Sequence, residues 1–323
     1  MTACTEHERA FNLFGSRVLL LIGAPLGAER RPADLAALEV EAMLRGLHSE
    51  LTRFESGSAL SLLNADANEQ IETTPSVALL VEAARVAALE SGGLVDASVV
   101  EVLERTGYAR SRTGLEPADL REALRAAPLR KAAAATNLGL WRRVSVELAK
   151  ATVRRPSGMR IDSGGSGKGL AADLAARHLT GFSSFAIDCG GDIRIGGLAG
   201  FDREVDILHP YEPASVLRLA LADGGVATSG LRTRIWKDGE RYSHHLIDPG
   251  SGKPAWTGIV QATALAPTAV SAETLAKFAF LSGPEGARRV LDEHGGLFVH
   301  DSGEVEAVGP IVLIQPLVSE SAA

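Results

Sequence analysis

The stretch from Met159 to Asp173 constrains the fold more than any other part of this 323-residue chain. A short strand-like run leads into Asp162, then into four glycines and Lys168, and an alanine-rich helical pattern comes next. Glycines in such a turn let the backbone approach a ligand closely, and free amides at a helix N-terminus stabilise anions. The segment therefore predicts a strand, a phosphate-binding loop with an acid at its entrance, and a helix.

Two familiar phosphate-binding loops do not match this segment. A P-loop requires Ser or Thr after its Gly-Lys pair, and here Gly169 follows Lys168. The dinucleotide fingerprint G-x-G-x-x-G also fails, because the spacing from Gly165 is G-x-G-x-G. The glycines alone leave two interpretations open: a phosphate site, or a strand-to-helix turn that needs glycine for packing.

The composition sets the size of the fold and argues against one class of partner. With 46% hydrophobic residues, the chain is long enough for one large domain or two closely fused ones. A net charge of -7 and a pI near 5.7 argue against a general nucleic-acid-binding surface. Cys4 and Cys189 are the only cysteines, so no zinc quartet is possible, and we expect no disulfide between them.

The N-terminal residues carry no recognisable export signal. Residues 1–8 lack a basic region followed by an apolar one, and Cys4 does not sit in a lipoprotein signal. The longest apolar run, around Val18 to Leu26, is too short to span a bilayer. We therefore expect a cytoplasmic protein without a membrane segment.

Hydrophobic periodicity predicts helices mainly in the first half of the chain and strands mainly in the second. Apolar residues recur at helical spacing over 34–54 and 75–89, and Thr74 before Pro75 is a typical N-cap. Further helices are expected over 99–105, 117–126, 169–179, 272–281 (N-capped by Ser271) and 284–293. Strands are expected over 16–22, 144–148, 184–188, 192–196, 204–208, 216–221 and 260–266.

This order of elements predicts an α+β fold with mixed sheets flanked by helices, because the chain does not alternate regularly between strand and helix. We expect an N-terminal tail over residues 1–13, one domain over 14–316, and a C-terminal tail over 317–323. The domain is either undivided or split into two subdomains. The weakly patterned stretch 130–136 is either a loop or a domain edge.

Two further polar clusters could carry chemistry. His244 and His245 are adjacent on a predicted strand, so they point to opposite faces and at most one of them can enter a given pocket. Asp248 and Pro249, followed by glycines, indicate a turn. The run 227–230 is either the polar end of a strand or part of the wall of the same pocket.

In order and spacing these clusters resemble the FAD:protein FMN transferase family, the ApbE-like proteins, from about Phe14 to about Leu291. The matching segments are Phe14–Ser16 (family M-G-T), Phe54–Asn64 (aromatic-N-P-x-S-x-L-S-R-L-N), Val95–Val99 (F-D-P-T-V), Asp162–Gly169 (D-L-G-G-I-A-K-G), Cys189–Asp192 (L-G-G-D), Val226–Gly230 (V-A-T-S-G) and His245–Pro249 (H-I-I-D-P). No single motif is specific, but the seven together are.

The resemblance implies that the protein binds FAD, with Mg²⁺ at the pyrophosphate, and transfers FMN to a Thr or Ser hydroxyl of a partner protein with release of AMP. Some members hydrolyse FAD to FMN and AMP instead, and a non-catalytic FAD-binding or interaction protein is a further alternative. An unrelated α+β enzyme is a third. The residues implied by position are Phe14, Phe54, Leu94, Val95 and Asp96 for the flavin, Asp162 and Lys168 for the sugar-phosphate part, the Ile247 backbone to close the site, and His245 with Lys168 for catalysis.

The implied metal site departs from the family pattern. The family's ligands are a loop carbonyl, here at Gly165, and an Asp and a Thr four residues apart, where this chain has Glu273 and Lys277. Glutamate keeps a hard oxygen but displaces it by about 1.5 Å, and a protonated lysine cannot coordinate a metal. We expect Lys277 to occupy the metal's place and pair with Glu273. The alternatives are a lysine turned away from a weakened metal site or, from the i,i+4 spacing alone, an ordinary surface ion pair.

Overall fold

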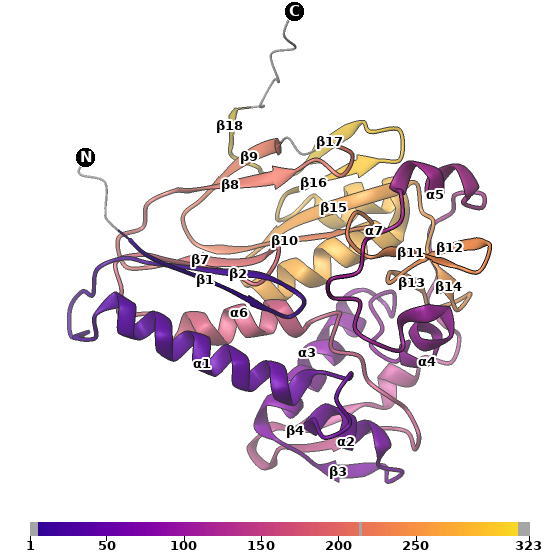
Figure 1. Ribbon diagram of the computed structural model, residues 1–323, viewed down its shortest axis with the longest axis horizontal. Helices are drawn as coiled ribbons and strands as arrows, with labels where there is room; N and C mark the ends of the chain where they lie inside the picture. Colours follow the sequence, from indigo (N-terminus) through magenta and orange to yellow (C-terminus); the bar gives the residue numbers. More distant parts are fainter. Residues whose placement is uncertain (1–5, 213–214, 316–323) are drawn as a thin grey trace, which may run out of the picture.

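The computed structural model describes residues 6–212 and 215–315 and centres on one large antiparallel sheet (Figure 1). The eight strands are ordered β1-β2-β6-β7-β10-β15-β16-β17. Their bounds are β1 His7–Leu13, β2 Ser16–Ile22, β6 Phe185–Asp188, β7 Asp192–Gly196, β10 Gly224–Gly230, β15 Ile259–Ala266, β16 Gly296–His300 and β17 Val305–Val308. The expected α+β class is confirmed.

Three long helices cover one face of this sheet: α1 (Ala33–Leu51), α6 (Gly167–Arg177) and α7 (Ala269–Leu291) (Figure 1). Strand β2 shows why the sheet binds them, because Val18, Leu20 and Ile22 are fully buried while the alternate residues Arg17, Leu19 and Leu21 are exposed or partly exposed. Such alternation places one row of apolar side chains against the helices and fixes the register of the strand.

A second, three-stranded sheet covers part of the other face. It is ordered β18-β9-β8, with β8 Arg203–Leu208, β9 Ser215–Leu221 and β18 Leu313–Gln315. Val205 and Leu219 pack in one core cluster with Val226 and Val260 of the large sheet. Strand β15 is therefore buried at every residue, which explains its almost unbroken apolar sequence.

Shorter elements lie along the lower and right-hand sides of the molecule as drawn in Figure 1. The helical ones are α2 Ala59–Ala65, α3 Pro75–Glu90, α4 Val100–Leu103, the π-helical turn η1 Glu104–Tyr108, α5 Leu120–Ala126, η2 Leu140–Arg143 and η3 Leu148–Lys150. The strands are β3 Gln70–Glu72, β4 Ser145–Glu147 and β5 Thr152–Arg154 in one small sheet, β11 Ile235–Asp238 with β12 Arg241–His244, and β13 Ile247–Asp248 with β14 Lys253–Pro254.

Most predicted elements form, and two details of the prediction are wrong. Thr74 caps α3 as expected, since its hydroxyl accepts from the Val77 amide. Ser271 is not an N-cap: α7 begins earlier, and Thr268 caps it by accepting from the Ser271 amide at 3.2 Å. The two expected C-terminal helices are both present within α7, where a non-helical break at Gly283 (φ 67°) separates them just before Pro284.

The second correction concerns the chain ends. Residues 7–13 were expected in a tail but form β1, which pairs with β2 through a two-residue turn. Residues 317–323 lie outside the described residues. The stretch 130–136 is a loop, and its Ala134 amide donates to Asp248.

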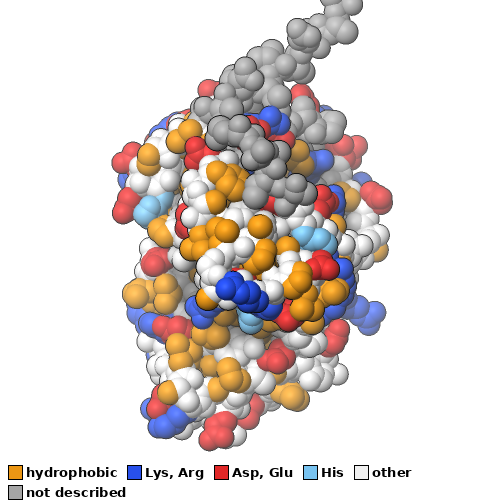
Figure 2. Space-filling model, turned by 90° about the vertical axis from the view of Figure 1, so that its left-hand side faces the viewer, with side chains coloured by type: hydrophobic (Ala, Val, Ile, Leu, Met, Phe, Trp, Pro, Cys, Tyr) orange, Lys and Arg blue, Asp and Glu red, His pale blue; other side chains and the backbone are white. Residues whose placement is uncertain are grey.

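The outer surface is mixed in character. Figure 2 shows the end that lies on the left of Figure 1, where hydrophobic side chains are interspersed with acidic and basic ones. Of the helices in the described part of the chain, none combines the length and apolar character needed to cross a bilayer.

Candidate functional site

A cavity of about 940 Å³ lies where many of these segments converge. Its wall includes the tip of the β1–β2 hairpin, the end of α1, the glycine loop before α6, the β6–β7 turn, the end of β10 and two residues from the middle of α7. Cavities of roughly 300–1,000 Å³ are typical for small-molecule and cofactor sites. This one is large enough for a dinucleotide.

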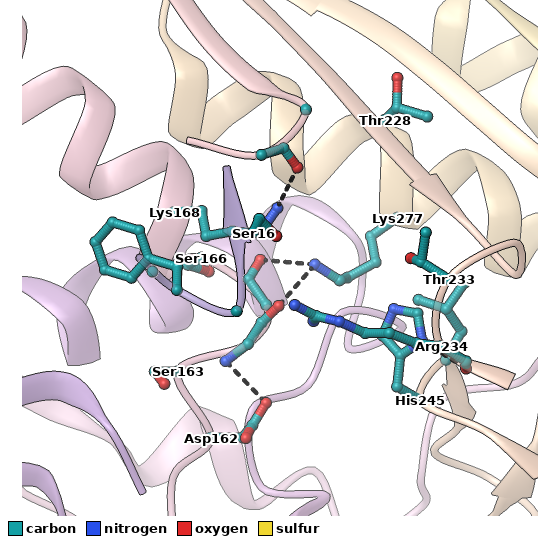
Figure 3. A pocket seen from close by; sticks show the side chains of 18 of the residues that line it. Ser16, Asp162, Ser163, Ser166, Lys168, Thr228, Thr233, Arg234, His245 and Lys277 are labelled. Carbon is teal, nitrogen blue, oxygen red and sulfur yellow. Dashed lines mark hydrogen bonds between the residues drawn. The ribbon is translucent and has the colours of Figure 1, made fainter. Parts of the chain in front are cut away.

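The glycine loop is braced from within by Asp162. One of its carboxylate oxygens accepts from the Arg53 Nε at 2.7 Å, and the other accepts from the Gly164 amide at 2.9 Å (Figure 3). A Cβ on Gly169 would lie 2.6 Å from the Ala269 carbonyl oxygen, so this glycine is needed for close packing of α6 on α7. A Cβ on Gly165 would meet nothing within 4 Å, so packing does not explain that glycine.

Lys168, at the first turn of α6, is fixed by the β6–β7 turn. Its ammonium forms an ion pair with the buried carboxylate of Asp192 and donates to the Gly190 carbonyl at 3.3 Å. Burial opposes the charged form, but the carboxylates of Asp192 and Glu273 outweigh it and raise the pKa of Lys168. The side chain is therefore a permanent cation at the pocket wall.

Lys277, from the middle of α7, reaches the glycine loop from the other side. Its ammonium lies 3.2 Å from both the Gly164 and Gly165 carbonyl oxygens and 3.3 Å from the Glu273 carboxylate (Figure 3). The Glu273 side chain is only 3% exposed, and its other oxygen accepts from the Gly169 amide at 2.9 Å. The ion pair is thus buried beneath the pocket, and the interpretation of these residues as a surface ion pair is wrong.

These residues do not fit a divalent metal ion. The carbonyl and carboxylate oxygens that could coordinate one converge on the Lys277 ammonium instead. Within the described ranges, no group of three or more His, Cys, Asp or Glu side chains is placed to hold a metal. Glu273 also lies behind the pocket and not on its wall.

Arg234 is a third positively charged residue near Lys168 and Lys277 on the pocket wall. It follows β10 in the segment that leads to β11, and Figure 3 shows its side chain directed from that segment toward the glycine loop. Across residues 6–212 and 215–315 its guanidinium has no ion pair and no side-chain hydrogen bond. We call Lys168, Arg234 and Lys277 the cationic end of the pocket.

His245 lies on the pocket wall beside these cations (Figure 3). Burial, and then the positive charge of Arg234, hold the pKa of His245 well below its usual range. The imidazole is therefore neutral at pH 7 and able to accept a proton. His244 points the opposite way, as expected for neighbours on a strand, and stacks edge-on to Trp256 at 4.7 Å in the core.

The other end of the pocket is aromatic. The Arg53 guanidinium lies 4.4 Å from the Phe54 ring centroid and 4.9 Å from that of Tyr108, and it donates to the Tyr108 carbonyl at 2.7 Å. Tyr108 in turn contacts the Trp236 ring at 5.6 Å. We call Arg53, Phe54 and Tyr108 the aromatic end.

Phe14 reaches the pocket from a strained turn. Phe14 and Gly15 join β1 to β2 with φ values of 54° and 70°, the left-handed pair of a type I′ hairpin turn. Left-handed backbone is unfavourable for a phenylalanine by about 1–2 kcal/mol. The ring packs edge-on against His48 with centroids 5.2 Å apart.

Asp96, on the pocket wall, has a buried carboxylate oxygen without a hydrogen-bond partner in the described residues. Asp96 is 7% exposed, and its Oδ1 accepts from the Ser98 amide, while its Oδ2 has no hydrogen bond in the described part of the chain. A buried carboxylate oxygen without a donor is costly unless a ligand supplies one. Asp96 therefore offers an acceptor to a bound molecule.

The structure brings almost all the residues singled out from the sequence to one cavity. The predicted residues on its wall are Phe14, Phe54, Leu94, Val95, Asp96, Asp162, Gly165, Lys168, His245, Ile247 and Lys277. Thr228 and Gly230 of the run 227–230 also line it. The expected pairing of Lys277 with Glu273 agrees with the observed geometry, and the alternative of a lysine turned away is wrong.

Sequence reasoning missed Arg53, Tyr108 and Arg234. Arg53 precedes the predicted Phe54, and Arg234 follows the polar run 227–230, so both lay beside residues already identified. Tyr108 had no such neighbour, because the π-helical turn that presents it has no sequence signature we could use.

Comparison with known proteins agrees with this geometry. An FAD:protein FMN transferase of Treponema pallidum is 30% identical over 325 aligned positions, which cover 92% of this chain and 87% of the relative. The corresponding transferase of Haemophilus influenzae is 27% identical, covering 91% and 87%. Two crystal structures share the fold: the ApbE protein of Thermotoga maritima (TM-score 0.76, 23% identity, covering 94% of this chain and 97% of that one) and the flavin transferase ApbE of Vibrio cholerae (0.72, 20%, 94% and 97%).

The model of the ApbE family matches residues 15–299, from the hairpin turn to β16. That range contains every residue placed at the cationic and aromatic ends of the pocket. This chain belongs to the ApbE family.

Proposed function

We propose that this protein binds FAD in the pocket and transfers its FMN part to a Ser or Thr hydroxyl of a partner protein, releasing AMP. The observation that carries the proposal is the convergence of segments far apart in sequence, from the β1–β2 turn to α7, around one cavity with an aromatic and a cationic end. The relatives of similar length are named for this reaction.

The two ends suit the two chemistries of FAD. Flat rings gain from stacking on aromatic side chains, and Phe14, Phe54 and Tyr108 provide such surfaces beside the unpartnered carboxylate of Asp96. A diphosphate needs positive charge and free amides, which the cationic end and the glycine loop provide. Ile247 also lines the pocket, and we propose that its backbone closes the site.

The transfer step requires a general base and stabilisation of the negative charge on the phosphoryl oxygens. The acceptor hydroxyl attacks the phosphorus on the FMN side, its proton passes to neutral His245, and the P–O bond to the AMP phosphate breaks, so AMP leaves with the bridging oxygen. Lys168 lies where it can stabilise the negative charge on the phosphoryl oxygens.

The direct test is to incubate the full chain with FAD and a Ser- or Thr-containing acceptor peptide, then measure AMP by chromatography and peptide mass. We expect AMP and a peptide heavier by one FMN less one water, and strongly slowed formation of both with the His245→Asn variant. AMP with free FMN and an unmodified peptide would instead identify an FAD hydrolase. Bound flavin without AMP would identify a non-catalytic FAD-binding protein.

A further inference from the structure

The three residues of the cationic end differ in how many of their hydrogen-bond donors are already used. An ammonium has three N–H donors and no acceptor. Three protein oxygens surround the Lys277 ammonium at 3.2–3.3 Å, from Gly164, Gly165 and Glu273. Lys277 therefore has no donor left for a ligand. What it contributes to the pocket is a fixed positive charge.

The hydrogen-bond donors of the Arg234 guanidinium, in contrast, have no partners in the described residues. A guanidinium has five donors in a rigid fork that matches two oxygens of a phosphate. In the described ranges no carboxylate pairs with it, although it lies close enough to Lys168 and His245 for its charge to act on both. An unpaired guanidinium on a pocket wall is suited to direct contact with an anion.

The positive charge at the cationic end is only partly paired. Lys168 forms an ion pair with Asp192 and also lies in the field of Asp188, and Lys277 forms an ion pair with Glu273. Within the described residues the Arg234 guanidinium has no such carboxylate, so its positive charge is unpaired before any ligand binds. A divalent cation could enter only by expelling the ammonium from its carbonyl and carboxylate partners, which would cost those contacts.

We propose that this pocket binds the diphosphate of FAD without a divalent metal ion, with Lys277 filling the cation position and Arg234 contacting the diphosphate oxygens directly. The inference rests on FAD being the ligand, as proposed above, and it adds the residue and the type of cation that hold it. Charge and hydrogen bonds to the diphosphate then come entirely from the protein, so chelators have nothing to remove.

The test is isothermal titration of the flavin-free full chain with FAD, once in EDTA and once in millimolar MgCl₂. We expect Kd values that agree within about twofold between the two buffers. Arg234→Met should weaken binding by about tenfold in both buffers, which is the effect of losing one charge-assisted contact. Lys253→Met removes an exposed lysine that is not on the pocket wall and should leave Kd unchanged.

A double variant tests the role of Lys277 by restoring oxygen ligands for a metal ion at this position. Glu273→Asp with Lys277→Thr removes the ammonium and offers oxygen ligands, so FAD binding should become stronger in MgCl₂ than in EDTA by about tenfold. Mn²⁺ is the metal probe: its electron paramagnetic resonance signal should be unaffected by wild-type protein with FAD and broadened by the double variant. Circular dichroism checks that each variant is folded.

Each outcome decides between the readings. Wild-type FAD binding that requires MgCl₂, or Mn²⁺ bound by wild-type protein, would overturn the metal-free site while leaving the proposed function intact. Unchanged FAD affinity in folded Arg234→Met would overturn the role of Arg234. No FAD binding by folded wild-type protein in either buffer would overturn the proposed function itself, and this inference with it.

Discussion

Two arginines of the pocket show how differently its ends are built. At the aromatic end Arg53 is paired with Asp162, bonded to the Tyr108 carbonyl and stacked between two rings, so its charge is neutralised and its position fixed. At the cationic end Arg234 has no such partner in the described residues. The first arginine is part of the protein's framework, and the second is available to a ligand. The comparison shows that partners, more than residue type, separate structural from binding arginines.

The largest expected effect concerns His245, at the cationic end. His245→Asn should lower the rate of AMP release by about 10²–10⁴-fold, the usual contribution of a general base, and leave the Kd for FAD nearly unchanged. Because the pKa of His245 is lowered, its neutral form should persist as the pH falls, so kcat/KM should stay level to below pH 6.5. A variant that keeps its rate would show that the base lies elsewhere.

The next effect separates the two arginines by stability. Arg53→Ala leaves the Asp162 carboxylate without its buried partner and should lower the free energy of unfolding by about 3 kcal/mol. Arg234→Ala removes no partner and should change it by less than about 0.5 kcal/mol. Urea unfolding of both variants measures the difference. Equal losses would remove the distinction between framework and binding arginine.

A third measurement distinguishes His244 in the core from its neighbour His245 on the pocket wall. Burial lowers the pKa of His244 from 6.5 to about 3, so the unfolded chain binds a proton that the folded chain does not. The contribution is therefore complete above pH 6.5 and is lost on acidification toward pH 3, at about 1.4 kcal/mol per pH unit. His244→Gln should make the stability–pH curve shallower in this window, with AMP release at neutral pH retained. An unchanged slope would mean that His244 titrates normally in the folded state.

The smallest effect tests the aromatic end alone. Tyr108→Leu should weaken FAD binding by about 1 kcal/mol, roughly fivefold, because one stacking surface is lost. Its effect on riboflavin, which has no diphosphate, should be the same, whereas Arg234→Met should affect FAD only. Fluorescence quenching of each flavin gives both values. Equal effects of the two variants on riboflavin would contradict the division into two ends.

The sequence predicted the elements whose local signals agree with their surroundings. Thr74 and Pro75 mark the start of α3 because the cap and the first-turn proline act locally, whatever the rest of the fold does. Strand β10 was not predicted as a whole, and only its residues 227–230 were considered as the possible end of a strand. Its three glycines disfavour a strand, and pairing with β7 and β15 on either side holds it in place.

For the site, too, residues with a local sequence signal were predicted and residues that depend on long-range packing were not. Residues inside motifs, such as Asp162 and Lys168, were predicted because neighbouring glycines gave them a context. Arg53 and Asp162 are 109 positions apart, and nothing in either segment indicates that they meet. Such pairings depend on how α1 packs beside the glycine loop, which periodicity cannot supply.

The turn at Phe14 has a consequence for the evolution of the protein. Asparagine or glycine would relax the backbone there and stabilise the hairpin, yet either would remove the phenyl ring from the cavity wall. Selection for heat resistance and selection for cofactor retention therefore act in opposite directions at a single codon. Relatives that have lost their ligand should have drifted toward the relaxed residue, which makes this position a marker of whether the cavity is still in use.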